Sequence, residues 1–196
     1  KGSRKKKGKA ASSSAKKPSK PRRHVREKKS SSSGVATQFE SVDTSNTRKQ
    51  LVIGLDFGTA FTKVVVGEVR FKIAIPLRGS GDKASDYLLP TVYWLSRDGK
   101  CSIDSPSGEQ HADLKMSLIE GNLAEAALRD AAVYLALVLR RIRAFIFDHK
   151  SEIYGGNYID WQINVGLPTD SYHDDKLTDA YRKVLGAAWM ASAEPG

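Results

Sequence analysis

The sequence contains little cysteine and no long hydrophobic run, and each absence excludes a class of protein. A single cysteine, Cys101, permits no disulfide within the chain, and the four histidines stand too far apart for Cys/His zinc spacing. The longest unbroken apolar run covers residues 131–139, far short of the roughly 20 residues of a membrane-spanning helix. We therefore predict no membrane span, and a reducing compartment, the cytoplasm, is the simplest interpretation.

The first 50 residues also lack Trp and Tyr. Only 8 of them are apolar, and they carry 16 Lys and Arg against 3 Asp and Glu. Such a segment cannot bury enough apolar surface to offset the entropy of ordering its backbone, so residues 1–48 are predicted to be a disordered basic tail rich in Ser and Lys. The chain starts with Lys and its basic start is followed by no apolar signal region, so we expect a processed product or a fragment.

Basic clusters within this tail occupy residues 5–7 (KKK) and 21–29 (PRRHVREKK). Clusters of this kind attract nucleic acid by releasing counterions, without reading bases, and no aromatic side chain interrupts them to stack on a base. Binding of nucleic acid through residues 1–33 is therefore one expectation. A solvated tail without a dedicated partner and a targeting signal are the alternatives.

The remaining residues, 49–196, have the size of one domain and are predicted to form a mixed α/β fold. An antiparallel three-stranded meander is expected first, then a hairpin, then loop as far as Asp113. A long amphipathic helix follows, with Asn122 as its cap, then a buried strand and a second amphipathic helix. The predicted strands cover residues 51–56, 61–69, 71–77, 89–95, 100–103 and 161–168, and the helices cover 123–146 and 174–190.

The turn after the first predicted strand carries the clearest chemical pattern of the chain. Asp56 ends that strand, and Gly58 lets the backbone turn sharply. The successive amides of Gly58, Thr59 and Ala60 can converge on phosphate oxygens, while the Asp56 carboxylate suits a magnesium ion that keeps several waters. An ordinary hairpin turn is the alternative.

This turn belongs to a series of segments that resembles the actin, hexokinase and seventy-kilodalton heat-shock chaperone superfamily. Residues 53–63 (IGLDFGTAFTK) are similar to its first phosphate loop, and four further segments match in the family's order. These are residues 89–93 (LPTVY), 113–118 (DLKMSL), 163–168 (INVGLP) and 193–196 (AEPG). The resemblance covers residues 49–196 and implies the first lobe of an actin-like ATPase domain with a ribonuclease H-like fold.

The resemblance also implies a set of roles in binding and hydrolysing ATP with Mg²⁺. Asp56 would order the metal through water, and the turn of Gly58, Thr59 and Ala60 would hold the β- and γ-phosphates. Lys115 would reach the transferred phosphate, and Glu194 would position the metal's waters or the attacking water. The alternatives are a solvated surface lysine and a helix-terminating turn, respectively.

The family binds nucleotide between two lobes, and no segment here matches the second lobe or the chaperones' peptide-binding domain. Our first interpretation is therefore half of the nucleotide clamp of a chaperone-like ATPase, with unfolded peptide or protein as its client. A filament-forming plasmid-segregation relative of actin and a nonenzymatic recruiting module with a nucleic-acid-binding tail are the alternatives. A ribonuclease H-like nuclease is disfavoured because it needs several clustered carboxylates and only Asp56 is well placed.

Overall fold

The computed structural model describes residues 48–68, 71–120, 123–168 and 174–193, all within the compact unit Asp43–Gly196. Its main sheet begins with β1 (Arg48–Phe57), β2 (Phe61–Gly67) and β3 (Lys72–Ala74), which pair antiparallel in chain order. The predicted meander is thus confirmed, with its second and third strands shorter than expected. The two-residue strand β4 (Leu89–Pro90) extends the sheet by pairing with the start of β2.

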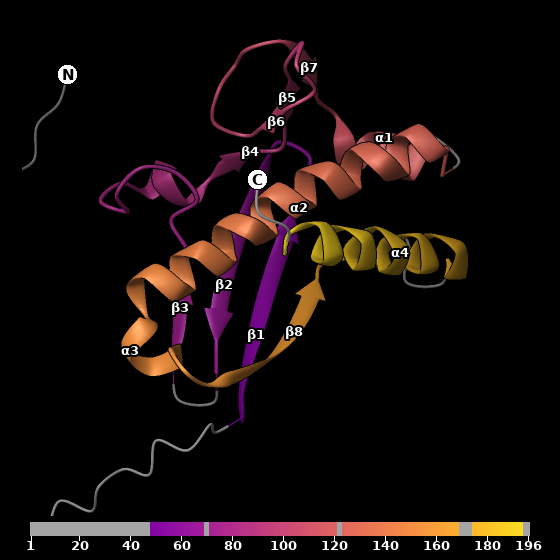
Figure 1. Cartoon of the computed structure of the whole chain (residues 1–196). Coiled ribbons are helices and arrows are strands. Elements are labelled where there is room, and N and C mark those ends of the chain that lie inside the picture. The colour runs from indigo at the N-terminus through magenta and orange to yellow at the C-terminus, as the bar shows by residue number, and fades with distance from the viewer. Residues whose placement is uncertain (1–47, 69–70, 121–122, 169–173, 194–196) are drawn as a thin grey trace, which may run out of the picture. The chain divides into compact units, whose positions relative to one another are not determined.

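The last strand of the main sheet, β8 (Tyr158–Val165), lies parallel to β1, so the strand order is β3-β2-β1-β8. The long helix α2 (Glu125–His149) and the short α3 (Ser151–Tyr154) precede β8, and α4 (Asp175–Ala191) follows it. Figure 1 shows α2 running obliquely across the strands of the sheet. A parallel neighbour needs such a crossover because β8 must run in the same direction as β1.

Alternating burial along β1 defines the two faces of the sheet. Leu51, Ile53, Leu55 and Phe57 point into the core and are at most 3% exposed, whereas the intervening residues are half-buried or exposed. The Phe57 ring stacks on Tyr134 of α2 at 5.9 Å and meets Tyr181 of α4 edge-on at 6.5 Å. Both helices therefore cover the same face of the sheet.

Residues 89–95 were expected to form one strand, but they are divided between two sheets. Their second part, β5 (Tyr93–Leu95), is the middle strand of a separate three-stranded sheet, between β6 (Cys101–Ser102) and β7 (Glu109–His111). The predicted hairpin is present as β5–β6, but the loop expected up to Asp113 is wrong, since β7 pairs with β5. The helix α1 (Leu114–Glu120) then precedes α2, and the 3₁₀ turn η1 (Ala84–Tyr87) precedes β4.

The start of α2 also differs from expectation. Asn122 lies outside the described residues, and the N-cap position is Ala124, whose side chain offers no hydrogen-bond acceptor. In contrast, the N-cap of α4 is Asp174, whose carboxylate accepts the amide protons of Lys176 and Leu177, both at 3.0 Å. The second predicted helix is confirmed to within one residue at each end.

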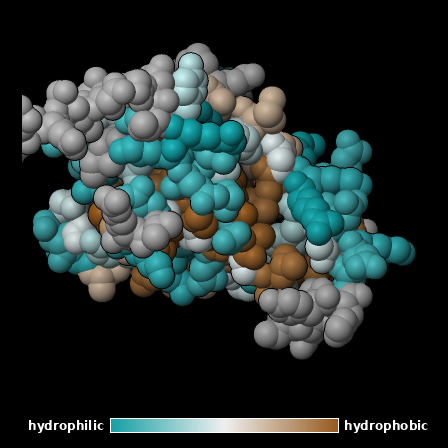
Figure 2. All heavy atoms as spheres, turned by 90° about the horizontal axis from the view of Figure 1, so that it is seen from below, coloured by the Kyte–Doolittle hydropathy of each residue, from teal (hydrophilic) through white to brown (hydrophobic). Residues whose placement is uncertain are grey.

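The surface combines hydrophilic margins with exposed hydrophobic residues, which form a band on the face seen in Figure 2. Large hydrophobic side chains that remain exposed in the described part of the chain are Phe61, Val65, Phe147, Tyr158 and Met190. No helix in the described part of the chain has both the length and the apolar character needed to cross a bilayer.

Candidate functional site

The turn between β1 and β2 needs glycine for steric reasons. It consists of residues 58–60, between the end of β1 at Phe57 and the start of β2 at Phe61. The Gly58 amide donates to the carbonyl oxygen of Asp56 at 3.1 Å. A Cβ atom on Gly58 would lie 2.3 Å from the carbonyl oxygen of Phe61, well inside contact distance. Residue 58 must therefore be glycine for the turn to keep this shape.

The three amides of this turn differ in whether they already donate a hydrogen bond. Because the Gly58 amide is bonded within the turn, it is not free to contact phosphate in this conformation. The amides of Thr59 and Ala60 donate no hydrogen bond within the described part of the chain, and both residues are exposed. Two of the three predicted amides are thus available to an anion, and the third supports the turn.

Beside the turn, Asp56 forms an ion pair that the sequence analysis did not anticipate. Its Oδ2 atom lies 2.8 Å from Nζ of Lys63, the residue directly opposite on β2. The two side chains are 56% and 53% exposed, so the pair contributes roughly 0–1 kcal/mol to stability and can exchange for other partners. The site therefore offers a carboxylate and an ammonium group that a bound ligand can separate.

The end of β8 lies next to the same turn. Leu55 of β1 pairs with Val165 of β8, and the Gly166 amide donates to the Leu55 carbonyl at 3.1 Å. Since the strands are parallel, their carboxyl ends lie at one edge of the sheet, where open α/β sheets bind their ligands. The structure thus brings the end of β8 and the Asp56 turn together at one edge of the sheet.

Two buried threonines support the turn from the core side, and the sequence analysis assigned neither of them a role in the site. Thr91 donates its amide proton to the Ala60 carbonyl at 3.0 Å and its hydroxyl proton to the Gly58 carbonyl at 2.9 Å. The hydroxyl of Thr62 lies 3.2 Å from that of Thr91. Thr91, directly after β4, provides both bonds to the turn's carbonyls, so a tertiary contact that no local pattern encodes positions the turn.

The two predicted catalytic residues are not joined to the turn by any described contact. Lys115 is half-buried in the first turn of α1, and the described part of the chain gives its ammonium group no hydrogen bond or ion pair. Glu194 lies outside the described residues, three positions after the end of α4 at Ala191. Their roles therefore remain predictions.

The groups at this edge fit a magnesium ion held through water rather than an all-protein metal cage. No group of three or more His, Cys, Asp or Glu side chains among the described residues is arranged to hold a metal directly. Asp56 supplies one exposed carboxylate next to two free amides. Mg²⁺ commonly binds through one or two carboxylates, substrate phosphates and several waters, and this arrangement suits that mode.

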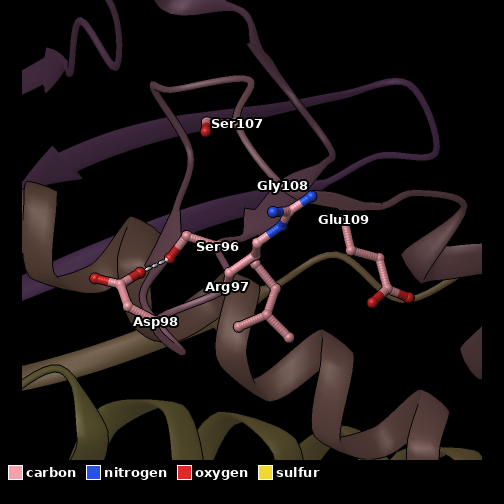
Figure 3. A pocket seen from close by; sticks show the side chains of 7 residues that line it. Ser96, Arg97, Asp98, Ser107, Gly108 and Glu109 are labelled. Atoms are coloured by element: carbon pink, nitrogen blue, oxygen red, sulfur yellow. Dashed lines mark hydrogen bonds between the residues drawn. The ribbon is translucent and has the colours of Figure 1, made fainter.

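A hollow lies beside the three-stranded sheet of β5, β6 and β7, and none of the predicted site residues lines it. Its volume is about 860 Å³, and Leu95, Ser96, Arg97, Asp98, Ser107, Gly108 and Glu109 surround it. Figure 3 shows the Asp98 carboxylate turned toward the Ser96 hydroxyl, which donates to it. Asp98 also pairs with Lys100 at 2.9 Å, so its charge serves the β5–β6 turn. We interpret the hollow as a product of the loop shape.

A polar cluster fastens this small sheet to α2. Asp130 of α2 accepts the Tyr93 hydroxyl at 3.2 Å and lies 3.2 Å from Nδ1 of His111. The rings of Tyr93 and His111 stack at 4.5 Å. Burial, with the nearby Asp130 charge, raises the pKa of Tyr93, which keeps its hydroxyl protonated as a donor. The cluster is therefore a structural tie between two elements.

Comparison with known proteins identifies no family for this chain, so the functional proposal depends on the geometry of the β1–β2 turn. No protein-family model matches the chain, and no curated protein matches its sequence.

Proposed function

We propose that this chain is the first lobe of an actin-like ATPase domain, closest to the seventy-kilodalton heat-shock chaperones, and that it binds the phosphates of magnesium ATP. The observation that carries the proposal is the convergence at one sheet edge of Asp56, the free amides of Thr59 and Ala60, and the end of β8. Exposed amides and an exchangeable cation suit a phosphate group, and the neighbouring carboxylate suits its magnesium ion.

The topology supports the ribonuclease H-like part of the proposal. An antiparallel meander, a crossover helix and a parallel strand beside the first strand give the order β3-β2-β1-β8. A ribonuclease H-like lobe would combine an antiparallel meander with parallel strands and packed helices, and the observed order leaves the first turn at the carboxyl edge of the sheet. The fold alone does not define a function, so the assignment depends on the turn.

In the proposed complex, the charged groups at this edge exchange partners. Lys63 would leave Asp56 for the phosphates, and the Asp56 carboxylate would accept hydrogen bonds from waters of Mg²⁺. The metal neutralises charge on the transferred phosphate when it is bound. Lys115 would then contact the transferred phosphate and Glu194 would orient water, as the resemblance implies.

The proposed binding mode requires a second lobe. The superfamily contacts nucleotide from both sides, whereas residues 49–196 resemble the first lobe only, so we expect this chain to bind magnesium ATP weakly by itself. A cytoplasmic chaperone-like ATPase acting on unfolded protein is the preferred assignment. A filament-forming relative would bind nucleotide through the same turn. Sedimentation with magnesium ATP distinguishes the two, because filaments should sediment and a chaperone-like ATPase should not.

Charge segregation favours one function of a different class. The net surplus of basic residues lies in the first 50, which suits a recruiting module whose tail binds nucleic acid and whose folded part hydrolyses nothing. Such a module would leave the turn unchanged when nucleotide is added, so the experiment below separates the two functions.

The test is Asp56→Asn, followed by amide NMR during titration with ATP in the presence and absence of magnesium. We expect the amides of Thr59 and Ala60 in the unmodified chain to shift at millimolar magnesium ATP. Asparagine keeps the shape of the side chain but loses the charge that orders the metal's waters. Loss of an outer-sphere partner of this kind weakens metal binding roughly tenfold or more, so the magnesium-dependent gain in affinity should fall by that factor.

Asp160→Asn is the matched control. Asp160 forms a comparable exposed ion pair with Arg48 at 3.0 Å, near the opposite end of β1. The control should retain the magnesium-dependent shifts. Absence of shifts at residues 58–60 in the unmodified chain, or equal losses in the two variants, would contradict the proposed function.

A further inference from the structure

Thr91 belongs to a hydrogen-bond network whose side chains, those of Thr62, Thr91 and Tyr134, are buried in the core. Thr62 and Tyr134 are 0% exposed and Thr91 is 1% exposed. The Tyr134 hydroxyl donates to the carbonyl of Pro90 at 3.2 Å, directly before Thr91. Burial raises the pKa of Tyr134 to about 12, so this donor remains protonated at neutral pH. The network thus joins α2, β2, the residues after β4 and the β1–β2 turn.

The direction of each bond in this network follows from counting protons. A threonine hydroxyl has one proton, and Thr91 gives its proton to the Gly58 carbonyl at 2.9 Å. In the 3.2 Å contact between the two hydroxyls, Thr62 must therefore donate and Thr91 must accept. The Thr91 hydroxyl is then satisfied on both sides. Any substitution that removes it takes one bond from the buried Thr62 hydroxyl and one from the partly buried Gly58 carbonyl.

These bonds also determine where the free amides of the turn point. The described peptide bonds are all trans, and in a planar trans peptide the carbonyl and the following amide point in opposite directions. The Gly58 carbonyl points toward Thr91 in the core, so the Thr59 amide must point away from the core. Thr91 thus sets the orientation of one of the two amides that are available to an anion.

We propose that Thr91 is a positioning residue that presets the β1–β2 turn for a phosphate group, through its bonds to the carbonyls of Gly58 and Ala60. The inference rests on the proposed function for the identity of the ligand, but the preset turn itself depends on the described contacts alone. Thr91 does not touch phosphate, and its effect on binding passes through the orientation of the Thr59 amide.

The test compares Thr91→Val, Thr91→Ser and the control Thr178→Val, which removes a half-buried hydroxyl from α4. Hydrogen exchange at the amides of residues 58 and 91 reports the order of the turn, since the amide at 91 donates to Ala60. Loss of the hydroxyl should speed exchange at both amides by about tenfold, while the β1 amides at Ile53 and Leu55 keep their rates. Serine should restore slow exchange.

NMR titration of the same variants with magnesium ATP gives the second measurement. Thr91→Val should weaken binding by about fivefold to tenfold relative to the unmodified chain, and Thr91→Ser and Thr178→Val should not. Equal affinity in Thr91→Val and the unmodified chain would overturn the inference while the proposed function stands. No binding by the unmodified chain would overturn the proposed function. In that case, faster exchange in Thr91→Val would still support the preset turn, and unchanged exchange would overturn that as well.

Discussion

At the scale of single residues, Gly58 determines whether the β1–β2 turn can form. Gly58→Ala would place a methyl group 2.3 Å from the Phe61 carbonyl oxygen, so the turn must open to relieve the contact. We expect a loss of about 1–3 kcal/mol in the free energy of unfolding, together with loss of the magnesium ATP shifts at the turn. Urea unfolding and amide NMR would measure the two effects.

Gly186→Ala is the matched control for this substitution. Gly186 is exposed on α4, and a Cβ atom added there meets nothing within 4 Å. Alanine favours a helix interior by about 0.5–1 kcal/mol over glycine, so this variant should be more stable. A Gly58→Ala variant as stable as the unmodified chain would show that the turn relaxes at little cost.

The same turn shows what the sequence can specify for a single residue. The order Asp56, Gly58, Thr59 predicted a sharp turn at the end of a strand, because the effect of glycine on the backbone depends only on its neighbours in the chain. Lys63 was not predicted as a partner of Asp56, since their contact depends on the register of two strands. Thr91 lies 33 positions from Gly58, and only the folded chain brings it to the turn.

At the scale of elements, the two main helices differ in whether the N-cap side chain accepts hydrogen bonds from the first backbone amides. Asp174 satisfies two amides of α4, whereas Ala124 satisfies none at the start of α2. We expect Asp174→Ala to lower the unfolding free energy by about 1 kcal/mol, and Ala124→Ser to raise it by a similar or smaller amount. Ala124 already has the extended backbone, with ψ of 142°, that an N-cap adopts.

Urea unfolding followed by circular dichroism would measure both changes. Because the two substitutions lie on different helices, the double variant should show nearly additive effects. If Ala124→Ser left the stability unchanged while Asp174→Ala reduced it, water would already satisfy the first amides of α2 as well as a side chain does.

Elements with a long periodic pattern were predictable, and short ones were not. The apolar positions of α2 recur over several turns and identify it as a helix, as do those of α4. The strand β7 has only three residues, none of them buried, and it owes its conformation to pairing with β5. The split of residues 89–95 between two sheets likewise reflects tertiary contacts, since β4 pairs with β2.

At the scale of the whole molecule, the sheet order depends on long-range pairing. Parallel contact between β1 and β8 joins residues about 110 positions apart, and no local pattern specifies which strand lies beside β1. The main sheet is therefore mixed, with an antiparallel meander and one parallel strand, β8, beside β1. The site at the carboxyl edge is a consequence of this pairing, because it requires both strand ends.

The core of the whole molecule contains several buried tyrosines, and these make its stability sensitive to alkaline pH. Burial raises the pKa of Tyr134 and of Tyr181 to about 12, from 10 in the unfolded chain. A pKa raised by folding contributes stability that is fully present below pH 10 and is lost as the pH rises toward 12. Each such tyrosine should lower the unfolding free energy by up to about 1.4 kcal/mol per pH unit in that window.

Tyr181→Phe isolates one of these contributions. The Tyr181 hydroxyl is buried without a hydrogen-bond partner among the described residues, so its removal should maintain or increase stability at pH 7. Between pH 10 and 12 the variant should lose stability less steeply than the unmodified chain, by up to the contribution of one tyrosine. Tyr158→Phe, at a residue that is 69% exposed, serves as the control for removing a tyrosine hydroxyl. Urea unfolding at each pH, with absorbance at 295 nm to follow tyrosinate, would make the comparison. If the unfolding free energy fell equally steeply with pH in the unmodified chain and in Tyr181→Phe, Tyr181 would ionise equally readily in the folded and unfolded states.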